Sequence, residues 1–374
     1  MPGSTRHSGR SPERLIKVMI VDDSAIVRGL ITQILETDER IVVAASVSDG
    51  SHALRILQRE DVDIVLLDIE MQQMDGLAAL PKMLVARPNV RVIIVSSMTQ
   101  ENAEISLRAL SMGAVDYVNK PSSRHELFSA DNFKVELLRK IAALGAGIGN
   151  AHTRYDRLRP RAGEGLKQAG HGPAGVLPLR PGSRAKPTIL AIGSSTGGPA
   201  ALKSFLPTIP PALMVPILIT QHIPATFTAY LTATLAQVSG RPAVEPFDGQ
   251  PVEAGHIYVA PGGYHMLVER RNSKPTFRLS DNAPENFCRP SVDPMLRSLA
   301  QTYGPGVVAV ILTGMGQDGR AGSTVVVEMG GTVLAQDEAS SVVWGMPGAV
   351  ANDGLCTAVL PLDEIGPHIS TLAA

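Results

Sequence analysis

The sequence predicts an α/β protein with two parallel sheets, each covered by helices and joined by a flexible linker. Two features support this prediction. Short, near-continuous apolar runs alternate with amphipathic stretches, and one Gly- and Pro-rich segment interrupts the alternation. The chain has 374 residues, which at roughly 150 residues per domain suggests two or three domains. Hydrophobic residues make up 44% of the chain, so it has enough apolar material for packed cores and is not disordered as a whole.

Charge and cysteine content exclude several classes of protein. Lys and Arg number 34 against 35 for Asp and Glu, a balance that gives no overall field to attract nucleic acid or an anionic membrane. The two cysteines cannot form a disulfide framework, which fits a reducing compartment. The longest apolar runs, such as 307–312, are too short to cross a bilayer, and residues 1–14 lack the apolar core of a signal peptide. We therefore expect a cytoplasmic protein with a disordered tail over 1–14, no membrane insertion and no nucleic-acid partner.

The first domain is predicted over residues 15–144, as five βα units around a parallel sheet. Ser24 is a suitable N-cap for a helix whose apolar residues recur at helical spacing. Further helices are expected over 52–59, 103–112 and 124–144. The strands are expected over 15–21, 41–47, 62–67, 90–95 and 115–118.

The rest of the chain divides into a linker and a second domain. Residues 145–187 are rich in Gly and Pro, Lys and Arg far outnumber the acidic residues, and no hydrophobic period persists, so this segment is predicted to be a flexible basic linker. Residues 188–374 resume the α/β pattern, which predicts a mainly parallel, doubly wound sheet. Its strands are expected over 188–192, 215–220 and 307–312, with a more β-like stretch over 243–280.

Polar residues in the first domain follow the predicted strands. Asp22, Asp23 and Asp68 lie at carboxyl ends, which share one edge of a parallel sheet where ligands bind. Carboxylates that converge there repel one another unless a cation joins them, and Mg²⁺ prefers such oxygen ligands. Ser96 and Lys120 fall at later strand ends, where a hydroxyl and an ammonium could neutralise a phosphoryl group. The pattern predicts a Mg²⁺-dependent phosphoryl site.

The second domain contains the pattern of a nucleophile elbow, in which a serine sits on a tight strand-to-helix turn between two glycines. Here the pattern is Gly193-Ser194-Ser195-Thr196-Gly197, and its spacing selects Ser195 over Ser194. The glycines do not fit the GxGxxG dinucleotide fingerprint, and no lysine follows as in a P-loop.

A serine nucleophile needs a base, and the base needs an acid to orient it. His222 and Asp318 are the best candidates because each follows a buried strand that would share an edge with Ser195. The chain order Ser–His–Asp differs from the Ser–Asp–His order of α/β-hydrolases, which argues against a lipase or ordinary esterase fold. Weaker candidates lie outside this context: His256, His265, Asp248, Asp281 and Asp293.

The first domain resembles the response-regulator receiver family. The resemblance is carried by Val21-Asp22-Asp23-Ser24, Leu67-Asp68, Met74-Asp75-Gly76, Val95-Ser96 and Lys120-Pro121. It implies that Asp68 accepts a phosphoryl group from a sensor histidine kinase. It also implies a Mg²⁺ site at Asp23, Asp68 and the Glu70 carbonyl, with Asp22 in its outer part. Ser96, Tyr117 and Lys120 would form the switch, with a cis Lys120–Pro121 bond. Gln72 departs from the family, which usually has proline there.

The whole chain resembles the chemotaxis response-regulator protein-glutamate methylesterases, the CheB family. The matching stretches are 191–199, 220–224, 259–266, 289–293, 312–319 and 345–351. The family implies phosphorylation-activated hydrolysis of glutamyl γ-methyl esters on chemoreceptors, and deamidation of receptor glutamines. By resemblance Ser195, His222 and Asp318 form the triad and the Met315 N–H contributes to the oxyanion hole, with no cofactor in the esterase site. Ser194 departs from the usual alanine, and Cys288 from the common histidine.

The sequence disfavours two other classes of function. A purely regulatory protein, with a receiver and an inactive effector, is disfavoured by the intact set of Ser195, His222 and Asp318. A DNA-binding response regulator is disfavoured because no helix-turn-helix pattern with a basic recognition helix follows the linker.

Overall fold

The structure is a computed structural model of the 374-residue chain, and it describes residues 14–71, 76–97, 99–120, 131–146 and 177–373. Several expectations lie outside these residues: almost all of the tail, most of the linker, the start of the helix over 124–144, the departure at Gln72 and the Lys120–Pro121 bond. The domain boundaries and the flexible linker therefore stay predictions.

The N-terminal part forms a five-stranded sheet in the order β2-β1-β3-β4-β5. The pairs β1–β2, β1–β3 and β3–β4 are parallel. The strands are β1 (Ile16–Val21), β2 (Ile41–Val47), β3 (Ile64–Asp68), β4 (Arg91–Ser96) and β5 (Asp116–Asn119). All five lie within about two residues of the predicted strands, so the receiver-like architecture is confirmed.

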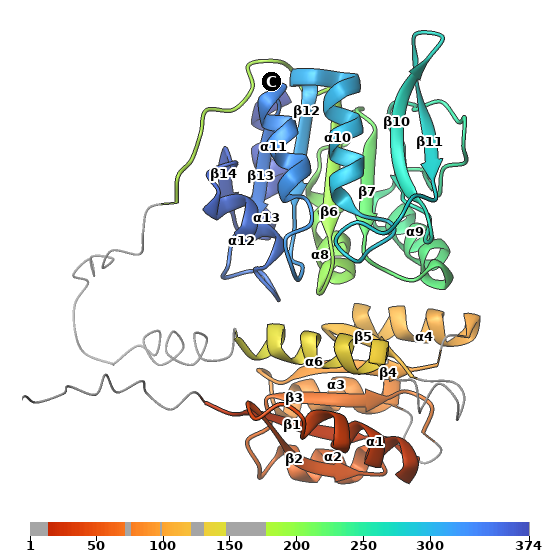
Figure 1. The fold of residues 1–374 in the computed structure, drawn as a ribbon, viewed down its shortest axis with the longest axis vertical. Coiled ribbons are helices and arrows are strands. Elements are labelled where there is room, and N and C mark those ends of the chain that lie inside the picture. Colours follow the sequence, from red (N-terminus) through yellow and green to blue (C-terminus); the bar gives the residue numbers. More distant parts are fainter. Residues whose placement is uncertain (1–13, 72–75, 98, 121–130, 147–176, 374) are drawn as a thin grey trace, which may run out of the picture. The chain divides into compact units, whose positions relative to one another are not determined.

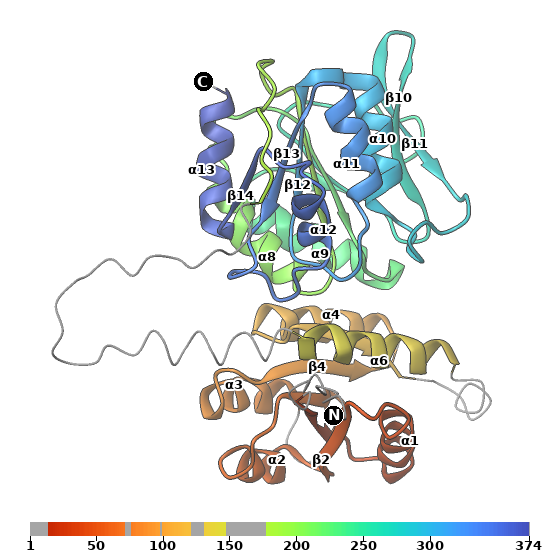
Figure 2. The same cartoon turned by 60° about the vertical axis from the view of Figure 1, so that its left-hand side comes forward.

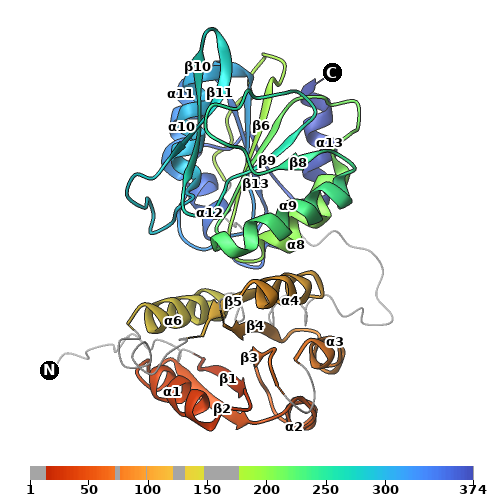
Figure 3. The same ribbon diagram turned by 90° about the vertical axis from the view of Figure 1, so that its right-hand side faces the viewer.

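Helices cover both faces of this sheet: α1 and α6 lie on one face, and α2 and α3 on the other (Figure 3). The helices are α1 (Ala25–Leu35), α2 (Gly50–Leu57), α3 (Gly76–Ala86), α4 (Gln100–Ser111) and α6 (Asp131–Ala146). Ser24 caps α1 as predicted, because its side chain accepts a hydrogen bond from the Val27 N–H. Helix α3 had no predicted range, since its apolar residues extend over much of the helix rather than along one stripe.

The C-terminal part forms a seven-stranded sheet in the order β14-β13-β12-β6-β7-β9-β8, and every pairing is parallel (Figure 1). The strands are β6 (Ile189–Ser194), β7 (Ile217–Gln221), β8 (Ala243–Val244), β9 (Ile257–Val259), β12 (Val307–Ile311), β13 (Thr332–Gln336) and β14 (Ala358–Leu360). The chain moves outward from β6 through β7 to β9 and β8, then returns to place β12 on the other side of β6. The carboxyl ends of β6 and β12 therefore form a topological switch point, where ligands bind in open α/β sheets.

The helices of the C-terminal part lie in two layers: α10, α11 and α12 on one face of the sheet, and α8, α9 and α13 on the other (Figure 3). They are α8 (Gly198–Phe205), α9 (Ala225–Ser239), α10 (Val292–Tyr303), α11 (Arg320–Glu328), α12 (Met346–Asn352) and α13 (Leu362–Ala373), with short 3₁₀ turns at Leu206–Thr208 and Gly304–Gly306. The β-like stretch contains an antiparallel hairpin of β10 (His265–Arg271) and β11 (Lys274–Ser280), which packs against α10 (Figure 2).

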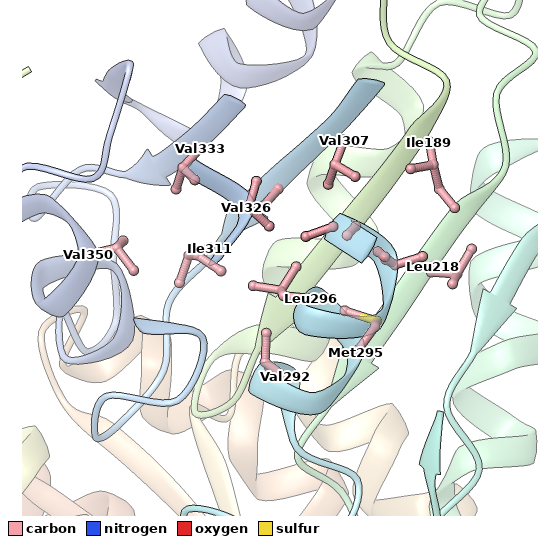
Figure 4. Packing of buried hydrophobic residues seen from close by; sticks show 14 of the residues in the cluster. Ile189, Leu218, Val292, Met295, Leu296, Val307, Ile311, Val326, Val333 and Val350 are labelled. Carbon is pink, nitrogen blue, oxygen red and sulfur yellow. The ribbon is translucent and has the colours of Figure 1, made fainter. Parts of the chain in front are cut away.

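The core of the C-terminal part is formed where α10 and α11 cover the central strands (Figure 4). Val292 and Leu296 of α10 pack with Val307 and Ile311 of β12, and all four side chains are fully buried. At roughly 25 cal/mol per Å² of buried apolar surface, such packing is the main stabilising contribution to the fold. It also fixes the N-terminus of α10 beside the loops that follow β6, β7 and β12. None of the described helices is long and apolar enough to span a membrane.

Candidate active site and phosphoacceptor site

The three predicted catalytic side chains follow three adjacent strands of the C-terminal sheet. Ser195 comes directly after β6 and His222 directly after β7, and these strands pair Ser194 with Gln221. The His222 N–H donates to the Ser194 carbonyl at 3.1 Å, and the Ser195 N–H donates to the carbonyl of Thr313, after β12, at 3.0 Å. The topology therefore brings the loops of Ser195, His222 and Asp318 to one edge of the sheet.

Gln221 braces the turn that presents Ser195. Its amide Nε2 donates to the Ser195 carbonyl at 2.9 Å and to the His222 carbonyl at 3.1 Å. Its Oε1 accepts a hydrogen bond of 2.6 Å from the Ser194 hydroxyl, which is fully buried. The Ser194 hydroxyl is therefore buried and hydrogen-bonded within the fold, whereas Ser195 is only half-buried. Sequence reasoning missed Gln221, although it lies between the strand and the base.

Asp318 orients His222 through a hydrogen bond of 2.7 Å between Asp318 Oδ2 and His222 Nε2. The Asp318 carboxylate lies at the N-terminus of α10 and accepts from the Val292 N–H at 2.7 Å and the Asp293 N–H at 3.0 Å. Further donors are the Ser291 hydroxyl, the Gly319 N–H and the Asn286 side-chain amide. Burial raises the pKa of Asp318, but the hydrogen bonds from His222, Val292 and Ser291 outweigh burial and lower this pKa to about 2.

The pKa of His222 is governed by the same balance. Burial lowers the pKa of the imidazole, whereas hydrogen bonds to Asp318 and to Cys288 raise it, with the net result that it rises to about 10. Asp318 therefore stabilises the protonated imidazole, which is the form that a general base reaches after it takes up a proton. Cys288, where the family commonly has histidine, is one of the groups that raise the pKa of His222.

A loop after β12 lies beside Ser195, the predicted nucleophile. A Cβ at Gly314 would lie 2.9 Å from the Ser195 Cβ and 2.3 Å from the Met346 Sδ, so only glycine fits between them. Met315 follows directly, and its N–H has no acceptor among the residues that the structure describes. A free N–H next to the nucleophile is what an oxyanion hole requires.

Two further residues join the site: Asn286, which no expectation named, and Asp293, which the sequence named only as a weaker candidate for the acid. The Asn286 amide donates to Asp318 Oδ1 and to Asp293 Oδ2, both at 2.9 Å. Burial and the charge of Asp318 raise the pKa of Asp293 to about 6, against the lowering effect of the Gly322 N–H and Asn286. Asn286 lies in the irregular segment before α10, so periodicity could not reveal its contacts, whereas Asp293 lies in the first turn of α10. For Asp293 the match over 289–293 was a signal.

The weaker histidine candidates have structural partners. His265 is buried, and its Nδ1 accepts from the Ser291 N–H at 3.2 Å while Nε2 lies 3.2 Å from the Ala283 carbonyl. The His256 ring contacts the Ala254 carbonyl and Glu253. Neither residue replaces His222.

The acidic cluster of the N-terminal part lies at the carboxyl ends of β1 and β3. Ligand oxygens of Asp22, Asp23 and Asp68 lie within 4.8 Å of one another, so these carboxylates are close enough to share one cation. Asp22 and Asp68 are buried and Asp23 is exposed. The Glu70 N–H donates to Asp68 Oδ1 at 3.0 Å and fixes that carboxylate. Hard carboxylate oxygens suit Mg²⁺.

The predicted switch residues follow the neighbouring strands. Ser96 ends β4, and its buried hydroxyl lies 3.0 Å from that of Ser106. Lys120 follows β5, and its N–H donates to the Ser96 carbonyl at 2.8 Å. Tyr117 lies within β5. Ser96 and Lys120 thus meet through the backbone, as expected for residues at adjacent strand ends.

Comparison with known proteins agrees with both parts of the fold. The CheB methylesterase family matches residues 190–369, and the response regulator receiver domain family matches residues 18–131. The chain is 50% identical to a protein-glutamate methylesterase/protein-glutamine glutaminase of Rhodospirillum centenum, over 100% of this chain and 98% of the relative. It is 52% identical to one of Paramagnetospirillum magneticum, over 96% of each chain. The crystal structure of the Thermotoga maritima CheB methylesterase catalytic domain shares 39% identity and covers 50% of this chain and 100% of its own, with a TM-score of 0.49.

The fold and the family matches define a methylesterase domain that follows a receiver domain. The chain belongs to the protein-glutamate methylesterase/protein-glutamine glutaminase family.

Proposed function

We propose that this protein removes methyl groups from glutamyl γ-methyl esters of chemoreceptors and deamidates receptor glutamines, under control of phosphorylation at Asp68. The observation that carries the esterase assignment is the 2.7 Å hydrogen bond that joins His222 to Asp318 beside the Ser195 turn. Family membership supports the proposal of a receptor substrate and a cytoplasmic location.

In the proposed reaction, His222 removes the proton from the Ser195 hydroxyl as its oxygen attacks the ester carbonyl. Because Nε2 is bound to Asp318, the other ring nitrogen takes this proton. The Met315 N–H stabilises the negative charge on the tetrahedral oxygen. The C–O bond to methoxide then breaks, and His222 returns the proton so that methanol leaves. Water repeats the sequence on the acyl-serine, which yields glutamate and free Ser195. With glutamine, ammonia leaves in place of methanol.

In the receiver domain, Asp68 is the proposed phosphoacceptor for a sensor histidine kinase. Asp22, Asp23, Asp68 and the Glu70 carbonyl would hold Mg²⁺, which neutralises charge on the transferring phosphoryl group. A carboxylate oxygen of Asp68 would attack the phosphorus atom as the P–N bond to the kinase's phosphohistidine breaks and the histidine leaves. The Lys120 ammonium would pair with the phosphoryl oxygens now on Asp68. Only glycine fits at position 76, because a Cβ there would lie 2.2 Å from the Asp68 carbonyl oxygen.

The esterase assignment is tested by methanol release from receptors that carry radiolabelled methyl groups. The wild-type chain should release methanol, and His222→Ala should release it about 10⁴-fold more slowly, the usual cost of losing a triad member. For the receiver, a small phosphodonor with Mg²⁺ should label the wild type but not Asp68→Asn. Equal rates for His222→Ala and wild type would refute the triad, and labelling of Asp68→Asn would place the phosphoacceptor elsewhere.

A further inference from the structure

A tight turn beside the catalytic residues exposes a phenylalanine to solvent. Glu285 and Cys288 form an isolated antiparallel bridge, with hydrogen bonds between their backbones of 3.1 and 2.9 Å. The two residues between them, Asn286 and Phe287, have φ of 53° and 63°. Phe287 is 91% exposed, more than any other large hydrophobic side chain among the described residues.

The turn is held firmly against the active site on both sides of Phe287. Asn286 donates to Asp318 and to Asp293, and Cys288 is held to Glu285 through the backbone. Glu285 is fixed by two hydrogen bonds from Arg297, of 2.6 and 2.7 Å. Phe287 therefore directly follows a residue that hydrogen-bonds to the predicted catalytic acid.

Phenylalanine is an unfavourable residue at this position for two reasons. A positive φ crowds the Cβ of a bulky side chain, so glycine or asparagine is the usual occupant. The hairpin turn between β10 and β11 has the same pair of positive φ angles, and there the residues are Asn272 and Ser273. Because the ring is almost fully exposed, it also contributes no buried apolar surface to the stability of the fold. Backbone strain that persists next to an active site points to a role in function.

We propose that Phe287 binds the protein substrate: its ring packs against an apolar side chain of the receptor next to the modified glutamate. This inference rests on the proposed function and names one of its substrate contacts. The receptor is a protein, so it offers neighbouring side chains that a small ester lacks. The contact lies outside the reacting atoms and is the same in ground state and transition state. It therefore lowers KM and leaves kcat unchanged.

The test replaces Phe287 by asparagine, which suits the turn and removes the ring. Methanol release from radiolabelled receptor-containing membranes is measured for the full chain with phosphodonor and Mg²⁺. Phe287→Asn should raise KM about tenfold, keep kcat within about twofold and leave Tm equal or higher. Phe287→Leu should recover KM to within about threefold of wild type. Met214→Asn is the matched control: Met214 is 59% exposed and precedes β7, at the opposite edge of the sheet, so KM should not change.

Three results would overturn the inference. The first is a KM of Phe287→Asn within twofold of wild type. The second is a fall in kcat and Tm together, which would mean that Phe287 only supports the turn. The third is an equal rise in KM for Met214→Asn. If the wild-type chain releases no methanol, the proposed function itself is wrong and the inference falls with it.

Discussion

At the residue scale, the chemistry depends on how firmly Asp318 is held. Five donors besides His222 reach this carboxylate, two of them N–H groups in the first turn of α10. The positive end of the α10 dipole favours a negative charge at this position. Asp318 therefore stays ionised and keeps His222 in one orientation. Ser195, His222 and Asp318 were predictable from sequence because each follows a buried strand. Asn286 was not, because it lies in an irregular segment that has no period to read.

The first prediction concerns pH. His222 acts as base only when neutral, and its folded-state pKa lies above the usual 6.5. The rate constant kcat/KM should therefore rise with pH through a midpoint above 6.5. Because Cys288 is one of the groups that raise this pKa, Cys288→Ala should move the midpoint to lower pH. Cys288→Ser, which keeps a hydrogen-bonding group, should lie between. A midpoint unchanged or raised in Cys288→Ala would contradict this account of the base.

The second prediction separates the two adjacent serines. Ser195→Ala removes the nucleophile and should reduce methanol release about 10⁴-fold or more. Ser194→Ala removes only the hydrogen bond to Gln221, so stability should fall by about 1 kcal/mol and activity should stay within about threefold. Rates and urea denaturation of both variants provide the measurement. Near-normal turnover by Ser195→Ala would rule out Ser195 as the nucleophile.

At the scale of elements, sequence patterns located the strands more accurately than the loops. Near-continuous apolar runs marked β1 to β5, β6, β7 and β12. Most of these strands are buried on both faces and have few polar residues, whereas the edge strand β2 is apolar but partly exposed. Strands β13 and β14 and the hairpin turn of β10–β11 had no predicted ranges. Strands β13 and β14 pair with each other and, in the case of β13, with β12, which no local pattern reveals, whereas the hairpin strands pair locally across Asn272 and Ser273. The nucleophile elbow was predictable because its serine and both of its glycines lie within five consecutive residues, so a local pattern contains the whole motif.

The third prediction concerns the loop that carries the oxyanion donor. Gly314→Ala places a methyl group against Ser195 and Met346, so the loop has to shift and Met315 moves with it. Loss of one oxyanion donor costs about 100-fold in kcat, and we expect a loss of that size with little change in secondary structure. Gly29→Ala is the control: nothing lies within 4 Å of a Cβ there, and α1 should be stabilised by roughly 0.5–1 kcal/mol. Equal activity of both variants would refute the role of this loop.

At the scale of the whole molecule, one chain combines a phosphoacceptor site and a hydrolase site. The sequence predicted both parts and their order, because motif residues recur at strand ends in each. How a phosphoryl group on Asp68 changes the rate at Ser195 is a property of the intact chain, and it is the central claim of the proposed function. Adding a doubly charged group at Asp68 would bias the positions of Ser96 and Tyr117, and coupling between sites of this kind is typically 1–3 kcal/mol.

The most direct test measures methanol release by the full-length chain with and without a small phosphodonor and Mg²⁺. The wild type should be activated about 5- to 150-fold, the range that corresponds to 1–3 kcal/mol of coupling. Asp68→Asn should stay at the basal rate under both conditions, and a chelator should return the wild type to that rate. If the phosphodonor activates Asp68→Asn as strongly as wild type, or activates neither, phosphorylation at Asp68 does not control the hydrolase.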